Sequence, residues 1–385
     1  MGDLTLDTSD VDRWIGVPLG GGELRDPVVA NDIRRWSQGM QNANPQYYDS
    51  DVASQGRYGR LVAPTSFTIA TDVGHGATPA IQGNIPGSHM LFGGDEWWIS
   101  GVLIEPGDQI HHERALFDYR VTDTSFAGPT MFSRGDTTYI NQRNEVVAKQ
   151  RSTSIRYLVS EALDRAKFTD EADPVWTDAQ LEEILGKQID YFAEVQERGH
   201  AKRLWKDVAE QDKLPERLIG PHSIQSFTTE WRAYNMNIWG SQVRHGVSST
   251  DQAGWLPEMS RESRATVIPS LGDGLYHGPS RGHVQQRYAQ LIGMPRGYGY
   301  GASMGAWILD YLQNWAGEWG QIVHSNAQYR SPALTGDVTS LTGIVTGKDV
   351  DTETGAHHVE VQYTMMDQQE SVMAKGKATI ALPTE

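Results

Sequence analysis

The stretch Trp307-Ile308-Leu309-Asp310-Tyr311-Leu312-Gln313-Asn314-Trp315 predicts an apolar helix. A turn at Thr335-Gly336-Asp337 comes after it, and three segments typical of β-strands follow at 339–347, 357–366 and 371–382. A helix that is apolar on most sides must be covered on most sides, and a wrapped antiparallel sheet does this. We therefore expect an α+β domain in this part of the chain.

An earlier part of the chain repeats the same order of elements. A turn at Pro106-Gly107-Asp108 precedes three strand-like segments, and an apolar segment at 61–70 lies upstream of it. Tyr47, Asp49 and Ala53 align with His283, Gln285 and Ala289 at one constant offset of 236 residues. These correspondences indicate an internal duplication whose two halves pair their sheets edge to edge, which leaves fewer open strand edges. The remaining expected elements are a helix at 31–40 and strands at 110–122, 130–141 and 146–157.

The region between the halves has a different character, with more charge and little glycine. Its apolar residues recur at helical spacing, and Thr177 with Gln180 forms a capping-box pattern at the start of the helix. We expect this connector helix to pack its apolar stripe on the body of the protein. The stripe consists of Leu181, Ile184, Leu185, Ile189 and Phe192. The expected organisation is an N-terminal half at 1–155, a helical connector at 156–218 and a C-terminal half at 219–385. The last begins with a helix at 227–239, capped by Thr228 or Thr229.

Composition narrows the class of function. The 385 residues carry a formal charge of −16, which disfavours nucleic-acid and anionic-membrane binding. The absence of cysteine excludes disulfides and thiolate chemistry. No segment has the apolar length of a membrane span, and the acidic N-terminus lacks a signal-peptide core, so we expect a cytoplasmic protein. The histidine pairs at 111–112 and 357–358 point to opposite faces of strands, so no metal site is expected.

One motif in each half resembles a known family. The segment Asn42-Ala43-Asn44-Pro45-Gln46-Tyr47 resembles the Asp-x-Asn-Pro-x-His signature of MaoC-like (R)-specific enoyl-CoA hydratases and dehydratases. His283 occupies the motif histidine position of the second half, with Ala289, Gly293 and Pro295 behind it at family-like spacing. The resemblance extends from about residue 25 to 155 and again from about 219 to 383. The first half also resembles a FAS1-like dehydratase. Its further matching segments are Tyr48-Asp49, Ala53, Arg57-Tyr58-Gly59, Val62-Ala63-Pro64 and Met90 to Asp108.

The resemblance implies a fold and a reaction. Each half would be a hotdog, a long helix wrapped by an antiparallel sheet, and the two would be fused by the connector into a double hotdog. Family members add or remove water at the β-carbon of an acyl-CoA thioester with an Asp–His pair, and a backbone amide at a helix start polarises the thioester carbonyl. Such a reaction needs groups that move protons on oxygen and at the α-carbon, and a donor for the enolate oxygen.

Departures from the motif locate the expected active site in the second half. Asn42 and Tyr47 replace the acid and the histidine of the first half, which therefore looks catalytically degenerate. In the second half His283 is the expected general acid/base, unless it is only a packing histidine, and Gly301 occupies the position of the oxyanion amide. Gly278 replaces the acid, so an acidic or basic partner must come from the insertion at about 245–276 or from the residues next to it. The candidates are Asp273 and His277 first, then Asp251, with Tyr300 as a further hydrogen-bond donor.

The expected ligand is an acyl-CoA thioester with a bulky acyl group, such as a fatty or steroid side chain. Twelve tryptophans suggest broad apolar surfaces, and Trp97, Trp98 and Trp255 are the expected tunnel residues. Arg281, Arg287 and Arg296 are the expected partners of CoA phosphates. No cofactor other than the CoA of the substrate is implied, and a homodimer is expected. Two other functions stay open: a non-catalytic acyl-CoA-binding or stabilising subunit, and an acyl-CoA thioesterase.

Overall fold

A computed structural model describes residues 6–20, 26–72, 76–165, 172–241 and 281–385 of the chain. Its centre is one ten-stranded sheet in which all neighbouring strands are antiparallel, in the order β1-β3-β4-β5-β2-β7-β10-β9-β8-β6. The strands are β1 (Pro18–Leu19), β2 (Ser88–Ile99), β3 (Ile110–Thr124), β4 (Gly128–Asn141), β5 (Val146–Leu158), β6 (Lys213–Ile219), β7 (Gln321–Tyr329), β8 (Thr339–Val350), β9 (His357–Met366) and β10 (Val372–Ala381).

The order of the strands shows the duplication directly. β2 and β7 pair at the middle of the sheet, with Asp95 opposite Ala327 and Trp97 opposite Ser325. On one side of this seam the order is β5, β4, β3, and on the other it is β10, β9, β8, so each half contributes the same meander. The expected strands are all present. β1, β6 and β7 are additional to the prediction, and most of β2 lies in the Met90 to Asp108 segment that resembles the family.

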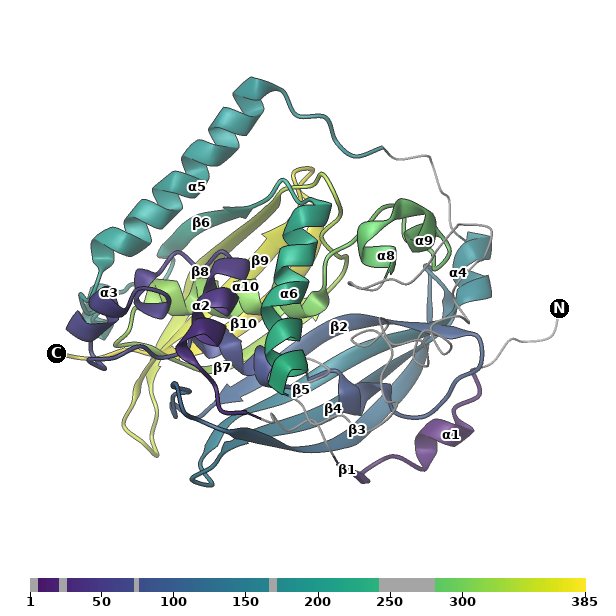
Figure 1. The fold of residues 1–385 in the computed structure, drawn as a ribbon, viewed down its shortest axis with the longest axis horizontal. Helices are drawn as coiled ribbons and strands as arrows, with labels where there is room; N and C mark the ends of the chain where they lie inside the picture. Colours follow the sequence, from purple (N-terminus) through teal and green to yellow (C-terminus); the bar gives the residue numbers. More distant parts are fainter. Residues whose placement is uncertain (1–5, 21–25, 73–75, 166–171, 242–280) are drawn as a thin grey trace.

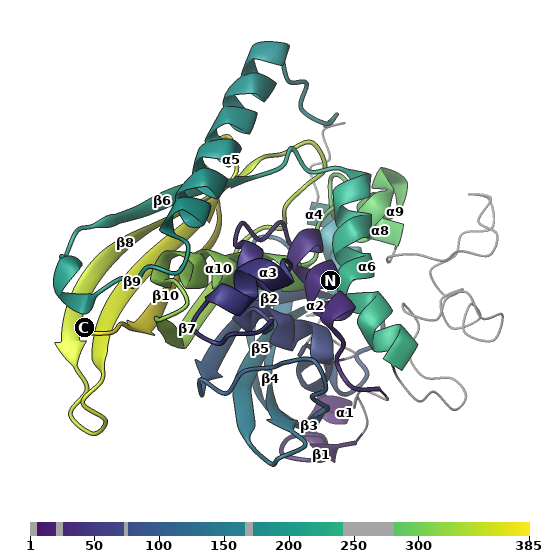
Figure 2. The ribbon, with the colours of Figure 1, turned by 60° about the vertical axis from the view of Figure 1, so that its left-hand side comes forward.

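The apolar helix that the sequence predicts is α10 (Gly301–Ala316), and it is the centre of the hydrophobic core. Every residue from Ala302 to Ala316 is buried, and Trp307 and Leu312 have no exposed surface. The strands of the second half lie around this helix (Figures 1 and 2). This arrangement confirms the α+β double hotdog.

The central segment of the first half is shorter than expected. Residues Thr65–Thr71 form a 3₁₀ helix, η2, which packs against α10 and is buried from Ser66 onward. Pro64 precedes it, and the Thr71 hydroxyl donates to the carbonyl of Thr68 at 2.8 Å. Such side-chain bonds compete with regular helical backbone bonds, which is consistent with a short helix here. The first half thus contributes to the core mainly through its sheet, because its central helix is short.

The connector contains a short helix, α4 (Val159–Arg165), and a long one, α5 (Asp178–Arg198). The expected capping box is confirmed, because the Thr177 and Gln180 side chains each accept from the other residue's backbone amide. The expected packing of the apolar stripe is wrong for three of its residues. The body contacts another face of the helix instead. Strand β6, and not a helix, ends the connector, and it pairs with β8 at the edge of the sheet. The three exposed members are Leu181, Leu185 and Ile189.

Helices α2 (Ala30–Gly39) and α6 (Ile224–Ser241) pack against each other on the side of η2. The expectation that Thr228 or Thr229 caps α6 is wrong, since both hydroxyls donate to carbonyls one turn earlier inside the helix. Ser223 accepts from the Ser226 amide in their place at 3.1 Å. The short elements are α1 (Ser9–Asp12), η1 (Pro45–Tyr47), α3 (Ser50–Gln55), η3 (Thr78–Ile81), η4 (Trp205–Asp207), α8 (Arg281–Val284) and α9 (Gln286–Gln290).

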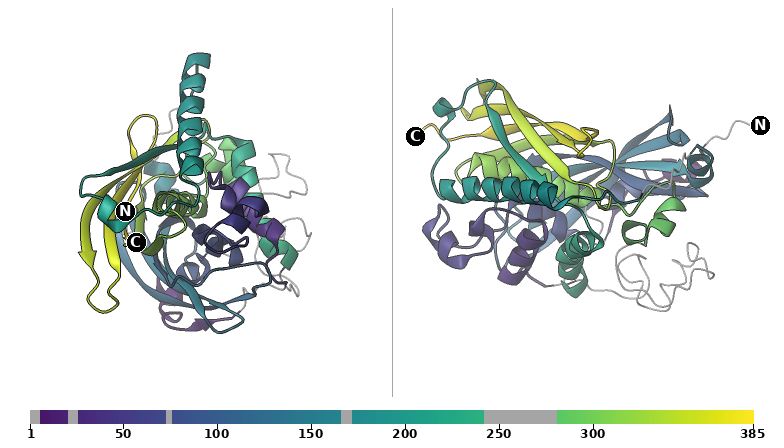
Figure 3. Two further views of the ribbon diagram at one scale, coloured as in Figure 1. Left: turned by 90° about the vertical axis from the view of Figure 1, so that its left-hand side faces the viewer. Right: turned by 90° about the horizontal axis from the view of Figure 1, so that it is seen from above.

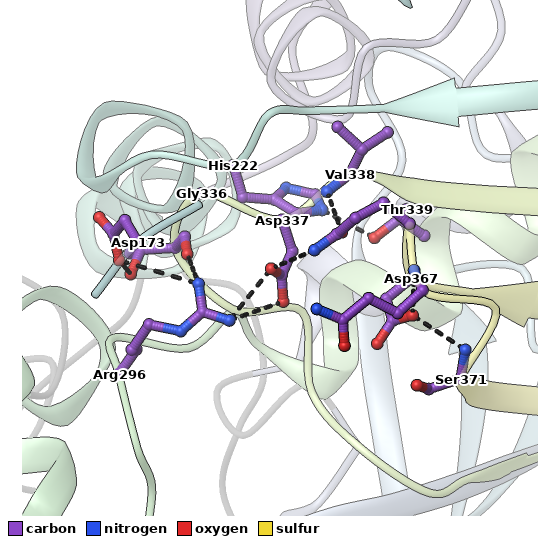
Figure 4. A network of polar contacts seen from close by, with 12 residues as sticks. Asp173, His222, Arg296, Gly336, Asp337, Val338, Thr339, Asp367 and Ser371 are labelled. Carbon is purple, nitrogen blue, oxygen red and sulfur yellow. Dashed lines mark hydrogen bonds and ion pairs between the residues drawn. The ribbon is translucent and has the colours of Figure 1, made fainter. Parts of the chain in front are cut away.

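Two equivalent aspartates hold the last hairpin turn of each half. Asp108 accepts from the Gln142 amide in one half, and Asp337 accepts from the Gln368 amide in the other, both at 2.8 Å. Figure 4 shows the second of these sites, where Asp337 also binds Arg296. The repeated turn motif is therefore structural in both halves. Among the residues that the structure describes, no helix has the length and apolarity to cross a membrane.

Candidate active site

A cavity of about 230 Å³ lies where the start of α10 meets the sheet of the first half. It is mainly apolar, with few polar groups. Such a shape and lining are usual for small-molecule sites. The second half contributes to the cavity lining from α8, from the loop before α10, from the start of α10 and from the end of β7. The residues of both halves that line the cavity are Ala77, Ile81, His89, Met90, Leu91, Phe92, Ser154, Ile155, His283, Tyr298, Gly299, Tyr300, Gly301, Ala302, Met304, Tyr329, Arg330, Ser331 and Pro332.

His283 is held in one orientation at the wall of this cavity. Its ring stacks on Tyr300, with centroids 3.7 Å apart, and its Nδ1 lies 2.6 Å from the carbonyl of Tyr298. A carbonyl only accepts, so Nδ1 carries the proton and Nε2 is the unprotonated nitrogen of the neutral ring. Burial lowers the pKa of His283 to about 3. The side chain is therefore neutral at physiological pH, and the lone pair of Nε2 can accept a proton.

Gly301 opens α10 at the same cavity. A side chain at this position would place its Cβ 2.5 Å from the Cβ of Phe92, so the close approach of β2 requires glycine. Tyr300 is the N-cap residue, and its carbonyl accepts from the Ser303 and Met304 amides, which leaves the Gly301 and Ala302 amides without a backbone partner in the described part of the chain. The start of a sixteen-residue helix attracts negative charge on a nearby oxygen. The start of α10 thus offers, beside His283, the Gly301 amide as a hydrogen-bond donor and a helix dipole that favours negative charge.

The first half supplies the apolar wall and a second imidazole. Phe92 on β2 stacks on Tyr329, with ring centroids 5.8 Å apart, and Ile155 on β5 lies beside them in the lining. His89 on β2 packs edge-on against Tyr157, and burial lowers its pKa to about 4. Both imidazoles of the cavity are therefore neutral, and each comes from a different half of the chain.

A second, smaller cavity of about 110 Å³ occupies the equivalent place in the first half. Tyr47 and Thr65 line it, and they stand 236 residues before His283 and Gly301. The Tyr47 ring is buried, and burial raises the pKa of its hydroxyl well above the usual range. The Asn42 side chain contacts the buried Asp310 and does not line this cavity. Among the described residues that line this cavity there is no histidine, and Glu318 is the lining carboxylate.

Two of the expected tunnel residues do not reach either cavity. Trp97 is 2% exposed and stacks on Tyr139 in the core, at 5.8 Å between centroids. Trp98 points to the other face of the same strand, where it packs on His324. The large apolar rings of Trp97 and Trp98 made these residues the expected lining of a tunnel. The first part of β2, from His89 to Phe92, lines the cavity instead, and a register shift between Phe92 and Gly94 separates it from the tryptophans.

The expected phosphate-binding arginines also differ from the prediction. Arg296 is buried and donates to both carboxyl oxygens of Asp337, at 3.0 and 3.2 Å, so its charge is already neutralised inside the protein (Figure 4). Arg287 is exposed and donates to Gln285 at 3.1 Å, away from the cavity lining. Arg281 is the first residue of α8, two positions before His283. The cavity instead carries Arg330, an exposed cation whose guanidinium has no carboxylate partner in the described part of the chain.

The expected partners of His283 fall outside the described residues. These are Asp273, His277 and Asp251, together with the tunnel residue Trp255. Within the described ranges, Asp95 accepts from the hydroxyl of the lining residue Tyr329 at 2.9 Å. Burial raises the pKa of Asp95 to about 6. The described ranges contain no cluster of three metal-ligating side chains.

Sequence comparison places the first half. Residues 13–150 match the family described as the FAS1-like dehydratase domain region. This match concerns the first half of the chain and does not extend to the second. The chain is also 30% identical over 159 residues to a protein of Thermomonospora curvata described as a probable enoyl-CoA hydratase alpha subunit. That match covers 37% of this chain and half the length of the relative, so the chain spans only part of it.

Solved structures place the whole chain. A MaoC-like dehydratase superposes with a TM-score of 0.63 over 97% of this chain and all of the other, at 15% identity. A MaoC-like dehydratase from Phytophthora capsici superposes with a TM-score of 0.50 at 9% identity, over 97% of this chain and 98% of the other. At such low identity the similarity concerns the fold. The chain therefore shares the double-hotdog fold of these MaoC-like dehydratases, and its residues 13–150 match the FAS1-like dehydratase domain region.

Proposed function

We propose that this protein hydrates the double bond of a 2-enoyl-CoA, reversibly, in the cavity at the start of α10. The observation that carries the proposal is the neutral His283 imidazole, with Nε2 unprotonated, beside the Gly301 amide in one apolar cavity. The similarity to a protein described as an enoyl-CoA hydratase subunit supports the same chemistry. His283 and Gly301 come from the half whose motif histidine is retained.

The reaction needs one base and one oxyanion donor. The water oxygen bonds to the β-carbon while His283 Nε2 takes its proton, and the π electrons move through the α-carbon to the thioester oxygen. The amide of Gly301 and the field of α10 stabilise the negative charge that develops there. A proton then adds to the α-carbon, and the thioester carbonyl re-forms. The reverse sequence eliminates water.

The proton that adds to the α-carbon can come from either of the two imidazoles that line the cavity. His283 itself returns the proton to the α-carbon if one imidazole serves both steps, as the imidazolium that it forms is a good acid. His89 lies in the same lining and interacts electrostatically with His283. Asp273, His277 and Tyr300 remain proposed partners from the sequence motif. Replacing His89 with glutamine separates the cases, since a shared role lowers turnover without abolishing it.

The acyl group and the CoA enter different parts of the cavity. Phe92, Ile155 and Ile81 form an apolar wall that suits a bulky hydrocarbon group. Arg330 is the exposed cation of the lining, and we assign it to the phosphates of CoA. Arg281 remains a proposed second phosphate partner because it starts the helix that carries His283. A steroid or long-chain acyl group is the proposed substrate class.

Product analysis tests the proposal against the two alternatives. The purified protein is incubated with crotonyl-CoA, a long-chain 2-enoyl-CoA and a steroid-side-chain enoyl-CoA, and the products are identified by mass. We expect the 3-hydroxyacyl-CoA, with the bulky substrates favoured. Free CoA would show a thioesterase, and binding without any product would show a non-catalytic subunit. Either of these outcomes rejects hydration.

A further inference from the structure

A buried ion pair lies at the start of the loop that precedes α10. The Arg296 guanidinium donates to both carboxyl oxygens of Asp337, at 3.0 and 3.2 Å, and to the carbonyl of Thr335 (Figure 4). Asp173 also contributes, because its carboxylate accepts from the Thr335 hydroxyl at 2.7 Å. Asp173 precedes α5, the helix that extends beyond the rest of the chain in Figure 3. Replacing a buried ion pair by apolar residues is often neutral for stability, so this pair needs a role other than stability.

The ion pair fixes the start of residues 296–300, which we call the 296–300 loop. Two backbone hydrogen bonds continue the contact between this loop and the turn before β8. The Thr335 amide donates to the carbonyl of Gly297 at 2.8 Å, and the Gly299 amide donates to the carbonyl of Ala333 at 2.7 Å. The conformation of the loop therefore depends on its attachment to the segment that carries the aspartate of the ion pair.

Two groups of the candidate active site depend on the 296–300 loop. The carbonyl of Tyr298 accepts from Nδ1 of His283 at 2.6 Å, and Gly301 directly follows the last residue of the loop. A Cβ at Gly297 would lie 3.0 Å from the carbonyl oxygen of His283, so the loop also packs tightly against α8. One loop thus determines the tautomer of the proposed base and the place of the proposed oxyanion donor.

The first half has a different arrangement at the equivalent place. Arg60 stands 236 residues before Arg296, but its side chain is 58% exposed and it pairs with Glu105 at the surface. The aspartate of the turn in the first half, Asp108, binds Arg143 instead. Within the described residues, the buried form of the pair therefore occurs in the half that carries the histidine. This difference favours a role in the site over a general role in the fold.

We propose that Arg296 and Asp337 are positioning residues for the base and the oxyanion donor of the cavity. The inference rests on the proposed function, because that function assigns these roles to His283 and Gly301. Loss of the ion pair releases the Tyr298 carbonyl from its place beside the imidazole, and the ring proton then occupies either nitrogen. A ring with its proton on Nε2 has no lone pair on that nitrogen and cannot accept a proton there.

Nitrogen-15 NMR of the histidine side chains measures the position of the ring proton directly, with the His283 signals assigned from their loss in His283→Gln. The double variant Arg296→Met with Asp337→Asn removes both charges of the pair, so neither is left unpaired in the interior. We expect the proton on Nδ1 in the wild-type chain and a mixture of both tautomers in the double variant. If the double variant does not fold, Asp337→Asn alone is measured with the same expectation. A folded variant that keeps only the Nδ1 form would overturn the inference.

The matched control is Arg60→Met with Glu105→Gln, which removes the equivalent pair at the surface of the first half. On a 2-enoyl-CoA, we expect the Arg296 double variant to lose about tenfold or more in kcat with less than about a twofold change in KM, and the control to lose neither. A purely structural role would lower the unfolding temperature and leave kcat unchanged below it, which would contradict the inference. A wild-type chain without hydration activity would reject the proposed function, whereas the NMR measurement would still decide whether the ion pair positions the imidazole.

Discussion

At the scale of single residues, the base and the oxyanion donor of the site depend on backbone geometry. His283 is neutral because its ring is buried, and its tautomer is fixed because the Tyr298 carbonyl accepts from Nδ1. A histidine whose pKa is lowered to about 3 stays unprotonated from there upward. We therefore expect kcat/KM to show no acidic limb near pH 6.5, the usual histidine value. The pH profile between 4.5 and 8 measures this, and a limb at 6.5 that His89→Gln leaves unchanged would contradict it.

Arg330 makes a second prediction at this scale. Arg330→Ala should raise the KM for an acyl-CoA about tenfold or more, which corresponds to the loss of one charged hydrogen bond. It should not change the KM for the matching pantetheine thioester, which lacks the nucleotide phosphates. Arg287→Ala is the control, because Arg287 is exposed but does not line the cavity. An equal rise in the KM for both thioesters would show that Arg330 does not bind the phosphates.

Sequence reasoning found the motif residues of the site and missed those that tertiary pairing supplies. His283, Tyr300 and Gly301 were identified because motif spacing places them near one another, and the structure brings all three to one cavity. Phe92 comes from a strand of the other half, and no local spacing links it to His283. Arg330 follows β7, a strand that the sequence pattern does not predict. Arg296 was misassigned because its buried partner, Asp337, lies forty-one residues further along the chain.

At the scale of elements, α10 and β2 meet so closely that one added carbon must disturb them. Gly301→Ala places a Cβ 2.5 Å from the Phe92 side chain, and overpacking of this kind costs about 1–3 kcal/mol. We expect the variant to unfold at lower urea concentration and to lose turnover. The double variant Gly301→Ala with Phe92→Gly should be about as stable as Phe92→Gly alone, because glycine removes the Cβ of Phe92 that the added carbon meets. An unchanged urea midpoint for the single variant would show that the contact is absent.

Elements with strong patterns were predicted and those with polar or interrupted patterns were not. α10 is apolar throughout, so its existence was evident, although it begins six residues earlier than predicted. β6 contains Pro215, which interrupts a strand pattern, and it forms because it lies at the edge of the sheet, where proline is tolerated. The exposure of Leu181, Leu185 and Ile189 on α5 was not foreseeable. Helical periodicity predicts that these side chains share one face, but it does not predict which part of the protein covers that face.

At the scale of the whole molecule, three carboxyl groups are buried around α10. Burial raises the pKa of Asp95 and Asp310 to about 6 and that of Glu230 to about 8. Each folded pKa lies above the unfolded value, so the folded chain binds more protons between the two values, and stability falls as pH rises through that window. Below about pH 6 the buried His89, His222 and His283 contribute the opposite slope, because their folded pKa values lie below the unfolded one. We therefore expect the unfolding free energy to decrease mainly from pH 6 to 8.

Glu230 alone accounts for the upper part of this decrease, between pH 6 and 8. Glu230→Gln should flatten that part, where one raised carboxyl contributes up to about 1.4 kcal/mol per pH unit. Urea titrations at several pH values measure it, with Glu216→Gln as the control, because Glu216 is a partly exposed carboxyl on β6. A slope that Glu230→Gln leaves unchanged would show that this carboxyl is already ionised in the folded chain.

The duplication explains why equivalent places in the two halves each hold a cavity in the described part of the chain. Equivalent positions hold His283 in one half and Tyr47 in the other, so the second half keeps the proposed chemistry while the first provides the wall of the working cavity. The two halves are inseparable in this respect, because β2 and β7 form the seam on which the cavity rests. Loss of either half would remove part of the site.

The ratio of kcat/KM between the wild-type chain and His283→Ala, on one bulky 2-enoyl-CoA, tests the central claim most directly. His324→Ala is measured beside it, because His324 is a histidine on β7 that binds Glu96 and does not line the cavity. We predict a fall of about a hundredfold or more for His283→Ala, with substrate binding retained, and no fall for His324→Ala. Full hydration activity in His283→Ala would contradict the assignment of this cavity as the active site.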